Sequence, residues 1–274
     1  MNIFITGCTS GIGKETVLTL AKENHQFFLA NRSAEKTAEL IKTMQSINPQ
    51  VQAHAIIVEL SSLLSVKKAA LDFLQRHQTL DILINNAGVY GQKGLTQDGY
   101  EMAFGTNFLA HFFLTHLLQP ALSLANNPRI INVASDAHWS AQFTSWDQLR
   151  RKTKSLTAFD EYGFSKLANI WHTNEITTKV QYQGIQAYSL HPGVVKTGIW
   201  RHIPKPLNYF GAMPFLKTPQ EGAKTTLFCI KTNGQFPNGQ YFSDCRPAQT
   251  SALAQNLQLQ KELWNYSLQA IQSI

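Results

Sequence analysis

The chain has 274 residues, of which 43% are hydrophobic and 15% are charged. This composition excludes a disordered protein and suits a chain that buries a large core. The net charge of +7 is spread along the sequence without a long basic run, so the continuous basic face that a nucleic-acid-binding protein needs is missing and no nucleic-acid partner is expected.

The cysteines and the first residues indicate the cellular setting. Cys8, Cys229 and Cys245 follow neither CxxC nor zinc-type spacing, which favours reduced thiols and no metal site. Met1 leads directly into an apolar segment, and no run of about 18 apolar residues occurs. Because α/β domains often reach about 250 residues, we expect a single cytoplasmic domain over residues 1–274 without a transmembrane segment.

Short apolar runs alternate with longer amphipathic stretches, as in parallel strands joined by crossover helices. The expected strands are 2–6, 26–30, 51–58, 80–85, 129–134, 184–190 and 239–242. The expected helices are 12–24, 34–47, 62–77, 98–124, 158–182, 219–232 and 255–271, with Ser33, Ser61 and Thr218 as N-cap residues. The pattern predicts a doubly wound α/β Rossmann fold, in which a mostly parallel seven-stranded sheet has helices on both faces and binds ligands at the carboxyl ends of its strands.

A glycine-rich turn lies between the first strand and the first helix. Its glycines permit a tight turn and a close backbone approach to a pyrophosphate, and the N–H groups of the helix N-terminus face the phosphates. The residues predicted to bind the cofactor here are Thr6, Gly7, Thr9, Ser10, Gly11, Ile12 and Gly13.

The end of the second strand decides between the two nicotinamide dinucleotides. NAD-binding proteins carry an acid at this point for the ribose hydroxyls, whereas this chain has Ala30-Asn31-Arg32. The planar guanidinium of Arg32 suits a 2′-phosphate, and Lys14 offers a second positive charge. The alternative is an exposed arginine without a ligand. The sequence favours NADP(H), with Asn31 and Arg32 in the site.

Four residues carry the predicted catalysis. Tyr162 and Lys166 are four apart in a helical pattern and share one helix face, so the ammonium favours the phenolate of a side chain that otherwise titrates near pH ~10. Ser135 follows a strand and is placed to hold a substrate oxygen. Asn107 lies in the preceding helix and could anchor a water-mediated proton relay toward Lys166. Each of these residues alone also has an ordinary structural explanation.

Two long segments, 136–157 and 197–217, interrupt the alternation and are expected to form a pocket wall and a substrate lid. Their aromatic side chains suit an apolar substrate, although packing within the loops explains them equally well. These residues are Trp139, Phe143, Trp146, Trp200, Tyr209, Phe210 and Phe215.

With these motifs in order, the chain resembles the short-chain dehydrogenase/reductase family over essentially its full length. Thr6 to Gly13 match the family's TGxxxGxG, and Asn85-Asn86-Ala87-Gly88 match its NNAG. Asn107, Ser135, Tyr162 and Lys166 match its catalytic tetrad, and Pro192-Gly193 with Thr197 match its PGxxxT. The resemblance implies further cofactor contacts from Glu59, Leu60, Asn86, Ala87, Gly88, Tyr162, Lys166, Pro192, Gly193, Val195 and Thr197.

Within the family, the segments GIGKET, SKLAN, LHPGVV, KTPQEGA and YFSDC resemble the retinol dehydrogenase-like branch, which includes relatives of the WW-domain oxidoreductase. This implies NADP(H)-linked interconversion of a carbonyl and an alcohol on a lipophilic substrate such as a retinoid or steroid, and a homodimer or tetramer paired through the helices of Asn107 and Tyr162. The chain departs from the branch at Glu59, where an aspartate is usual, and at Ala134, where a serine is common. A catalytically quiet NADPH-binding sensor or scaffold is the alternative function.

Overall fold

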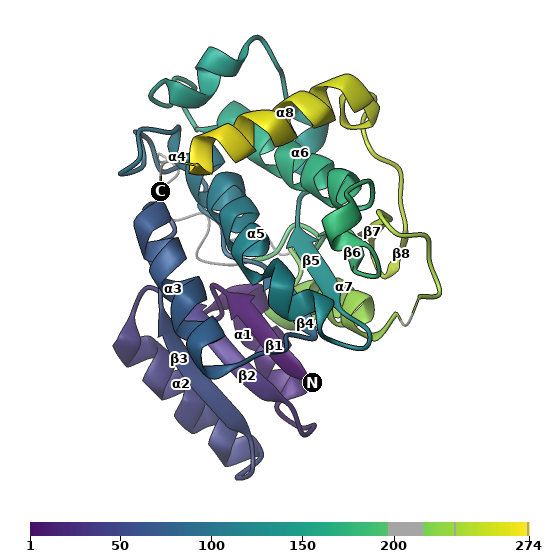
Figure 1. Ribbon diagram of the computed structural model, residues 1–274. Coiled ribbons are helices and arrows are strands. Elements are labelled where there is room, and N and C mark those ends of the chain that lie inside the picture. The colour runs from purple at the N-terminus through teal and green to yellow at the C-terminus, as the bar shows by residue number, and fades with distance from the viewer. Residues whose placement is uncertain (197–215, 233, 273) are drawn as a thin grey trace.

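The computed structural model describes residues 1–196, 216–232, 234–272 and 274. Its described part contains one sheet in the order β3-β2-β1-β4-β5-β6-β7-β8 (Figure 1). The strands are β1 (Asn2–Thr6), β2 (Gln26–Asn31), β3 (Gln52–Ile57), β4 (Ile82–Asn85), β5 (Arg129–Val133), β6 (Gln186–His191), β7 (Tyr241–Ser243) and β8 (Arg246–Pro247). The neighbours from β3 to β7 are parallel, which confirms the predicted Rossmann fold.

The predicted number of seven strands is wrong, because β8 adds an eighth strand antiparallel to β7. Two residues are too few to leave an alternating pattern in the sequence. The tight turn before them places Asp244 and Cys245 in the left-handed region, at φ values of 50° and 58°, a conformation that sequence rules assign mainly to glycine and asparagine.

Helices cover both faces of the sheet (Figure 1). The helices are α1 (Gly11–Leu20), α2 (Ala34–Ile47), α3 (Leu63–Arg76), α4 (Met102–Phe104), α5 (Ala110–Ser123), α6 (Phe159–Ile176), α7 (Pro219–Lys231) and α8 (Leu257–Ile271). A π-helical turn, η1 (Gly105–Leu109), joins α4 to α5. Short 3₁₀ turns are η2 (Asp136–Ser140), η3 (Trp146–Arg150), η4 (Val180–Tyr182) and η7 (Leu253–Gln255).

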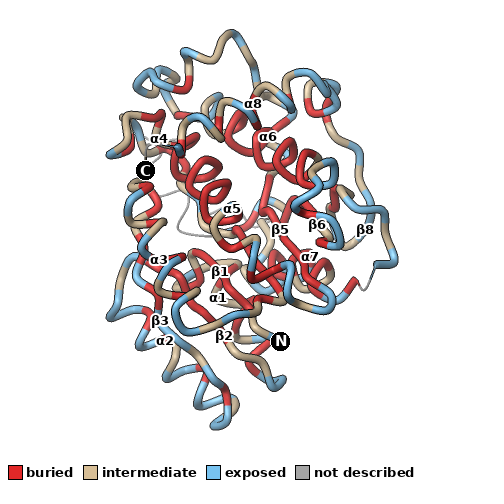
Figure 2. The backbone as a smooth tube through the Cα atoms, viewed as in Figure 1, coloured by how far each residue is buried: buried red, intermediate tan, exposed pale blue. Residues whose placement is uncertain are grey.

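The buried residues form two apolar clusters, one on each face of the sheet, and Figure 2 shows the inner sides of the helices as buried. Ile3 and Ile5 of β1 pack with α1, α2 and α7, whereas Phe4 between them packs with α3, α5 and α6. This division follows from the period of two along a strand. Because β1 is buried on both faces, its sequence is a continuous apolar run and does not alternate between apolar and polar residues.

The predicted helix starts are mostly confirmed. Ser33 accepts a hydrogen bond from the backbone N–H of Lys36, and Thr218 forms a reciprocal capping box with Glu221. The predicted cap Ser61 is wrong by one residue: Ser62 caps α3, because the Ser61 hydroxyl donates to Glu59 Oε1 instead.

The helix predicted at 98–124 begins at Met102 and contains the π-helical turn. Gly105 lies at the start of that turn, and a Cβ there would approach Thr96 Cγ2 to 2.4 Å. The segment around Thr96 thus packs closely against the start of the π-helical turn. No local pattern in the sequence indicates this change from α-helix to π-helix.

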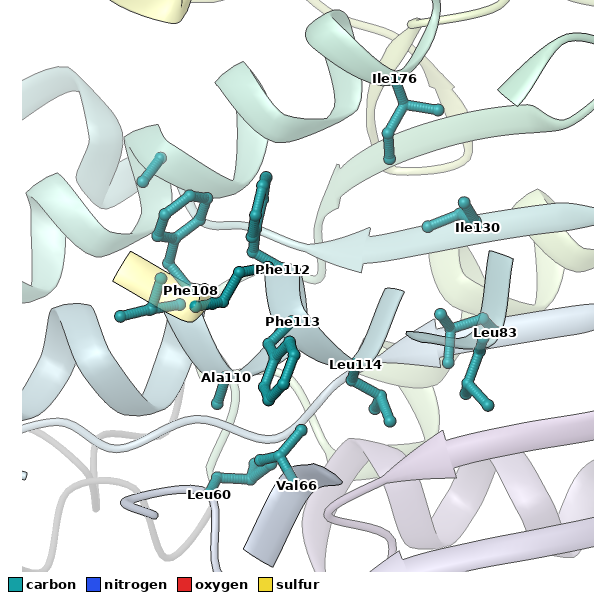
Figure 3. Packing of buried hydrophobic residues seen from close by; sticks show 14 of the residues in the cluster. Leu60, Val66, Leu83, Phe108, Ala110, Phe112, Phe113, Leu114, Ile130 and Ile176 are labelled. Carbon is teal, nitrogen blue, oxygen red and sulfur yellow. The ribbon is translucent and has the colours of Figure 1, made fainter. Parts of the chain in front are cut away.

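Helix α8 covers the outer side of α5 and α6. The Trp264 ring meets Phe112 with ring centroids 5.0 Å apart, and Figure 3 shows Phe113 pointing toward Val66 and Leu60, away from Phe112. Phe108, Phe112 and Phe113 are therefore buried within the chain. The sequence leaves two roles open for these rings, contact with a second subunit or packing on the sheet, and the structure shows them packed inside the chain.

The buried imidazole of His172 makes the stability of the protein sensitive to acid. Neither ring nitrogen has a hydrogen-bond partner among the described residues, and burial lowers the pKa of His172 from 6.5 to about 3. Between these pH values only the unfolded chain binds the proton, so the free energy of unfolding should fall by about 1.4 kcal/mol per pH unit as the pH drops below 6.5.

Replacing His172 by leucine should remove that contribution. We expect His172→Leu to unfold at the same or a higher temperature at pH 7.5, because it removes an unpaired buried polar group, and to lose less stability at pH 5 than the wild type. Urea denaturation at the two pH values measures this. An unchanged acid dependence in His172→Leu would show that other groups control it.

Candidate active site

The carboxyl ends of four neighbouring parallel strands bring the predicted site together. In the sheet β1 lies beside β4, β4 beside β5, and β5 beside β6. The glycine turn, the segment 86–88, Ser135 and the segment 192–195 follow these strands in that order. They therefore meet along one edge, although Gly7 and Gly193, for example, are 186 positions apart in the chain (193 − 7).

The glycine turn has the geometry of a phosphate cradle. Gly7 and Gly11 adopt φ values of 67° and 58°. A Cβ on Gly13 would lie 2.5 Å from Asn86 Nδ2 and 2.6 Å from the Gly7 carbonyl oxygen. Helix α1 begins at Gly11, and within the described chain the Ser10 side chain makes no capping hydrogen bond. The N-terminal N–H groups of α1 thus face the site, which fits the pyrophosphate of a dinucleotide.

Thr6 and Asn86 fasten this turn to the end of β4. Thr6 Oγ1 accepts hydrogen bonds from the backbone N–H groups of Asn86 and Ala87, each at 3.0 Å. The Asn86 amide donates to the Thr6 and Gly7 carbonyl oxygens at 2.8 and 3.0 Å. Both side chains are thus engaged with the backbone of the cradle, and they act on a ligand by shaping the turn.

The four residues predicted at the adenosine end have different surroundings. The buried amide of Asn31 accepts a hydrogen bond from the Cys8 N–H at 2.8 Å, so it holds the turn in place. Arg32 is 76% exposed, and its Nη1 lies 3.7 Å from Glu59 Oε2. The Glu59 carboxylate also accepts hydrogen bonds from Ser61, and Leu60 is buried in the core. Arg32 and Glu59 therefore supply the charged groups at the predicted adenosine end of the site.

Tyr162 and Lys166 lie on one side of α6, as their spacing predicts. The Lys166 ammonium is 5.6 Å from the centre of the Tyr162 ring and donates to the Val133 carbonyl oxygen at 2.8 Å. Burial lowers the pKa of Lys166 to about 7. Burial raises the pKa of Tyr162 to about 12, against the opposing effect of a hydrogen bond with the Ser135 side chain. The Tyr162 phenol is therefore protonated at neutral pH.

Ser135 is held in place from both sides. Its carbonyl oxygen accepts a hydrogen bond from His138 Nδ1 at 2.8 Å, and its hydroxyl oxygen caps η2 by accepting from the Ala137 N–H. Turn η2 packs tightly on α6, since a Cβ on Gly163 would lie 2.7 Å from the Ala137 carbonyl oxygen. This packing brings the hydroxyl of Ser135 next to the phenol of Tyr162.

Asn107 is in the middle of the π-helical turn, and its side chain is completely engaged. Its Oδ1 accepts from the Val89 N–H at 2.7 Å, while its Nδ2 donates to the Val89 carbonyl oxygen and to Ser165 Oγ at 3.0 and 2.9 Å. Gly88 lies close to both Asn107 and Lys166, since a Cβ on it would be 3.5 Å from Asn107 Oδ1 and 3.4 Å from Lys166 Nζ. The Asn107 amide thus clamps the segment after β4 onto α6, beside Lys166.

The segment after β6 packs against the glycine turn through α7. Val195 is buried, and a Cβ on Gly222 of α7 would meet both Val195 Cγ2 and Ile12 Cγ1. Gly193 adopts a φ of 89°, and a Cβ there would lie 2.5 Å from Lys217 Cδ. Pro192 leads into this turn, whereas Thr197 and most of the predicted lid lie outside the described residues.

The predicted aromatic wall is divided between two locations. Phe143 and Trp146 are half-buried and contact each other; Phe143 stacks on Phe164 and Trp146 on Tyr266, so both rings pack against the outside of the core. Trp139 is 56% exposed on η2. Trp200, Tyr209, Phe210 and Phe215 lie outside the described residues.

Tyr90, which belongs to none of the predicted motifs, has its ring centre 4.9 Å from that of Tyr162. It also contacts Phe159, with ring centres 6.1 Å apart. Tyr90 lies three residues after Ala87, and nothing in the local sequence pattern indicates its contact with Tyr162.

Among the described residues no helix is long and apolar enough to cross a membrane. The same residues contain no group of three or more His, Cys, Asp or Glu side chains arranged to hold a metal ion.

Comparison with known proteins agrees with the fold and places the chain in a family. The family model of short chain dehydrogenases matches residues 1–146. Human retinol dehydrogenase 11 is 38% identical over 97% of this chain and 84% of its own length. A chloroplastic short-chain dehydrogenase, TIC 32 A from Brassica napus, is 31% identical over 100% of this chain and 89% of its own length.

Solved structures have the same architecture. A protein of unassigned function from Mycobacterium paratuberculosis superposes with a TM-score of 0.77 at 28% identity, covering 98% of this chain and 92% of that one. An NADPH-bound carbonyl reductase from chicken fatty liver has a TM-score of 0.67 at 22% identity, covering 91% and 98%. The second likeness concerns the fold alone.

The Rossmann sheet and the polar groups along its edge define an oxidoreductase that uses a nicotinamide cofactor and acts on an alcohol or a carbonyl. The chain belongs to the short-chain dehydrogenase/reductase family and, within it, to the retinol dehydrogenase-like group, as the motifs predicted.

Proposed function

We propose that this protein is an NADP(H)-dependent oxidoreductase that interconverts a lipophilic carbonyl compound and its alcohol, with Tyr162 as acid and base. The observation that carries the proposal is the convergence of the Ser135 hydroxyl, the Tyr162 phenol and the Lys166 ammonium beside the glycine cradle. These are the groups that hydrogen-bond a carbonyl oxygen and exchange a proton with it.

In the reductive direction, the Ser135 hydroxyl and the Tyr162 phenol hydrogen-bond the carbonyl oxygen and polarise it. The nicotinamide supplies the hydride when bound. Tyr162 then gives its phenolic proton to the oxygen, which suits a phenol that is protonated at neutral pH. The Lys166 ammonium stabilises the phenolate that remains. In the oxidative direction Tyr162 takes up the alcohol proton instead.

The preference for NADP(H) rests on Arg32. Its guanidinium is exposed at the end of β2, and Glu59 at 3.7 Å orients it without burying it. Lys14 follows in the first turn of α1. A 2′-phosphate would find a planar, charged donor at this point, whereas the free ribose hydroxyls of NAD would find no carboxylate at position 31 or 32.

Replacing Arg32 by alanine should weaken NADPH binding by about 10- to 100-fold, the loss expected for hydrogen bonds to a charged group. The affinity for NADH should stay within about threefold, since NADH lacks the phosphate. Fluorescence titration with both cofactors measures the two dissociation constants, and Arg76→Ala is the matched control on an exposed arginine of α3. Equal losses for both cofactors would refute the role of Arg32.

The preference for a lipophilic substrate rests on apolar groups near Tyr162. Tyr90 packs on the Tyr162 ring and Phe159 on Tyr90. Leu156, which is 72% exposed, lies three residues before Phe159, and Trp139, which is 56% exposed, lies on η2, the turn that packs on α6. The names of the retinol dehydrogenase relatives support the same substrate class.

The experiment that tests this function follows NADPH oxidation with straight-chain aldehydes of increasing length. Each CH₂ group that enters an apolar pocket contributes about 0.8 kcal/mol, so kcat/KM should rise about fourfold per carbon until the pocket is filled. A flat series would refute the apolar pocket. Tight NADPH binding without turnover of any aldehyde or ketone would favour the sensor or scaffold.

The cytoplasmic location, the single domain and the homodimer or tetramer stay predictions. Because α8 covers the outer side of α5 and α6, we propose that any pairing of subunits uses a surface other than the one around Phe112.

A further inference from the structure

A buried histidine, which is not one of the four predicted catalytic residues, connects the glycine cradle to Asn107. His111 lies in α5, one turn after Asn107, and is almost completely buried. Its Nε2 is 2.9 Å from Thr6 Oγ1, and its Nδ1 is 2.9 Å from the Asn107 carbonyl oxygen. The ring therefore spans from the end of β1, where the cradle begins, to the π-helical turn.

The hydrogen bonds of Thr6 determine which ring nitrogen of His111 carries the proton. A hydroxyl oxygen has two acceptor sites and one donor hydrogen. Thr6 Oγ1 uses both acceptor sites for the N–H groups of Asn86 and Ala87, so its hydrogen must point to His111 Nε2. That nitrogen accepts, and Nδ1 consequently carries the proton, which it donates to the Asn107 carbonyl oxygen.

Burial keeps the ring in this neutral form. It lowers the pKa of His111 to about 4, and the nearby Lys166 acts in the same direction. A protonated ring would present a second N–H to Thr6 Oγ1, whose acceptor sites are filled. The hydrogen-bond pattern and the charge state therefore agree on one tautomer.

We propose that His111 is a positioning residue that couples the cofactor cradle to Asn107 through a fixed Nδ1–H tautomer. On one side its Nε2 holds the Thr6 hydroxyl and, through it, the N–H groups of residues 86 and 87. On the other side its Nδ1–H holds the Asn107 carbonyl, while the Asn107 amide clamps Val89 and Ser165. This inference rests on the proposed function only where turnover is measured.

His111 does not carry a proton through the site. Beyond Thr6 the chain of hydrogen bonds ends at two backbone amides, which do not release protons at ordinary pH. The ring contacts neither Tyr162 nor Ser135 in any hydrogen bond of the described residues. Its contribution is therefore geometric.

The tautomer of His111 can be measured without an assay of enzyme activity. Nitrogen-15 NMR of histidine-labelled protein, with His111→Phe used to assign the resonance, should show a protonated Nδ1 and an unprotonated Nε2. The two shifts should not change between pH 5.5 and 8. An Nε2–H tautomer, or a ring that titrates in this range, would overturn the proposal.

Two substitutions separate the two hydrogen bonds. The amide nitrogen of asparagine occupies nearly the position of Nδ1, so His111→Asn keeps the donor to Asn107 and loses the contact with Thr6. The amide oxygen of glutamine reaches the position of Nε2, so His111→Gln keeps the acceptor for Thr6 and loses the contact with Asn107. His116→Gln, on the exposed side of the same helix, is the control.

We expect His111→Asn to raise the NADPH dissociation constant by about tenfold and to keep kcat within about threefold of the wild type. We expect His111→Gln to lower kcat by about tenfold and to keep the dissociation constant within about threefold. Each effect is that of one lost buried hydrogen bond. Equal losses of both quantities in both variants, or no loss in either, would overturn the coupling. If the wild type binds NADPH but reduces no carbonyl, the proposed function fails, and the tautomer and the dissociation constants still decide the role of His111.

Discussion

Replacing Tyr162 by phenylalanine should lower kcat by about 10²- to 10⁴-fold, the range that general acid and base catalysis contributes. The substitution removes the only phenolic proton that the site places beside the Ser135 hydroxyl among the described residues. The ring remains, so its packing on Tyr90 should persist. The dissociation constant for NADPH should stay within about threefold.

Steady-state reduction of the best aldehyde and a fluorescence titration with NADPH measure the two effects. Tyr182→Phe is the matched control, because it removes a phenol that is buried near Trp264, and it should leave kcat unchanged. Turnover by Tyr162→Phe at more than about a tenth of the wild-type rate would show that another group donates the proton.

Replacing Gly13 by alanine should abolish cofactor binding, with an NADPH dissociation constant at least about 100-fold higher. The new Cβ would lie 2.5 Å from Asn86 Nδ2 and 2.6 Å from the Gly7 carbonyl oxygen. The Asn86 amide would then lose its hydrogen bonds to the Thr6 and Gly7 carbonyls, and the cradle would open. Overpacking of this kind typically costs about 1–3 kcal/mol of stability.

A binding titration and a thermal unfolding curve distinguish the two consequences. Thr19→Ala, on the exposed side of the same helix, should change neither. NADPH binding by a folded Gly13→Ala protein with unchanged affinity would show that the pyrophosphate does not lie in the cradle.

The structure refines the role that the sequence suggests for Asn107. Both hydrogens of its amide nitrogen are engaged, by the Val89 carbonyl oxygen and Ser165 Oγ, and its Oδ1 accepts from the Val89 N–H. The Asn107 backbone carbonyl, which accepts a hydrogen bond from His111 Nδ1 with one of its two lone pairs, is a second oxygen on which a relay toward Lys166 would find an acceptor. His111 thus orients one of the acceptors that Asn107 offers to such a relay.

Local patterns in the sequence determined the fold class, and they predicted the glycine cradle and the four catalytic residues. The strand β1 is recognisable as a short continuous apolar run, and the helix α2 by its amphipathic period. The spacing of Tyr162 and Lys166 places them on one face of α6, and a glycine turn between a strand and a helix has few other uses. Parallel strands then bring these motifs to one edge.

Only the tertiary structure decided how these groups are held. Thr6 meets His111 across 105 residues, Asn107 meets Ser165 across 58, and Arg32 faces Glu59 from a neighbouring strand. The π-helical turn beside Thr96 and the stacking of Phe143 on Phe164 likewise depend on contacts that form only on folding. Sequence patterns report the preferences of neighbouring residues, whereas hydrogen-bond direction, tautomer and burial are set by groups that become neighbours only on folding.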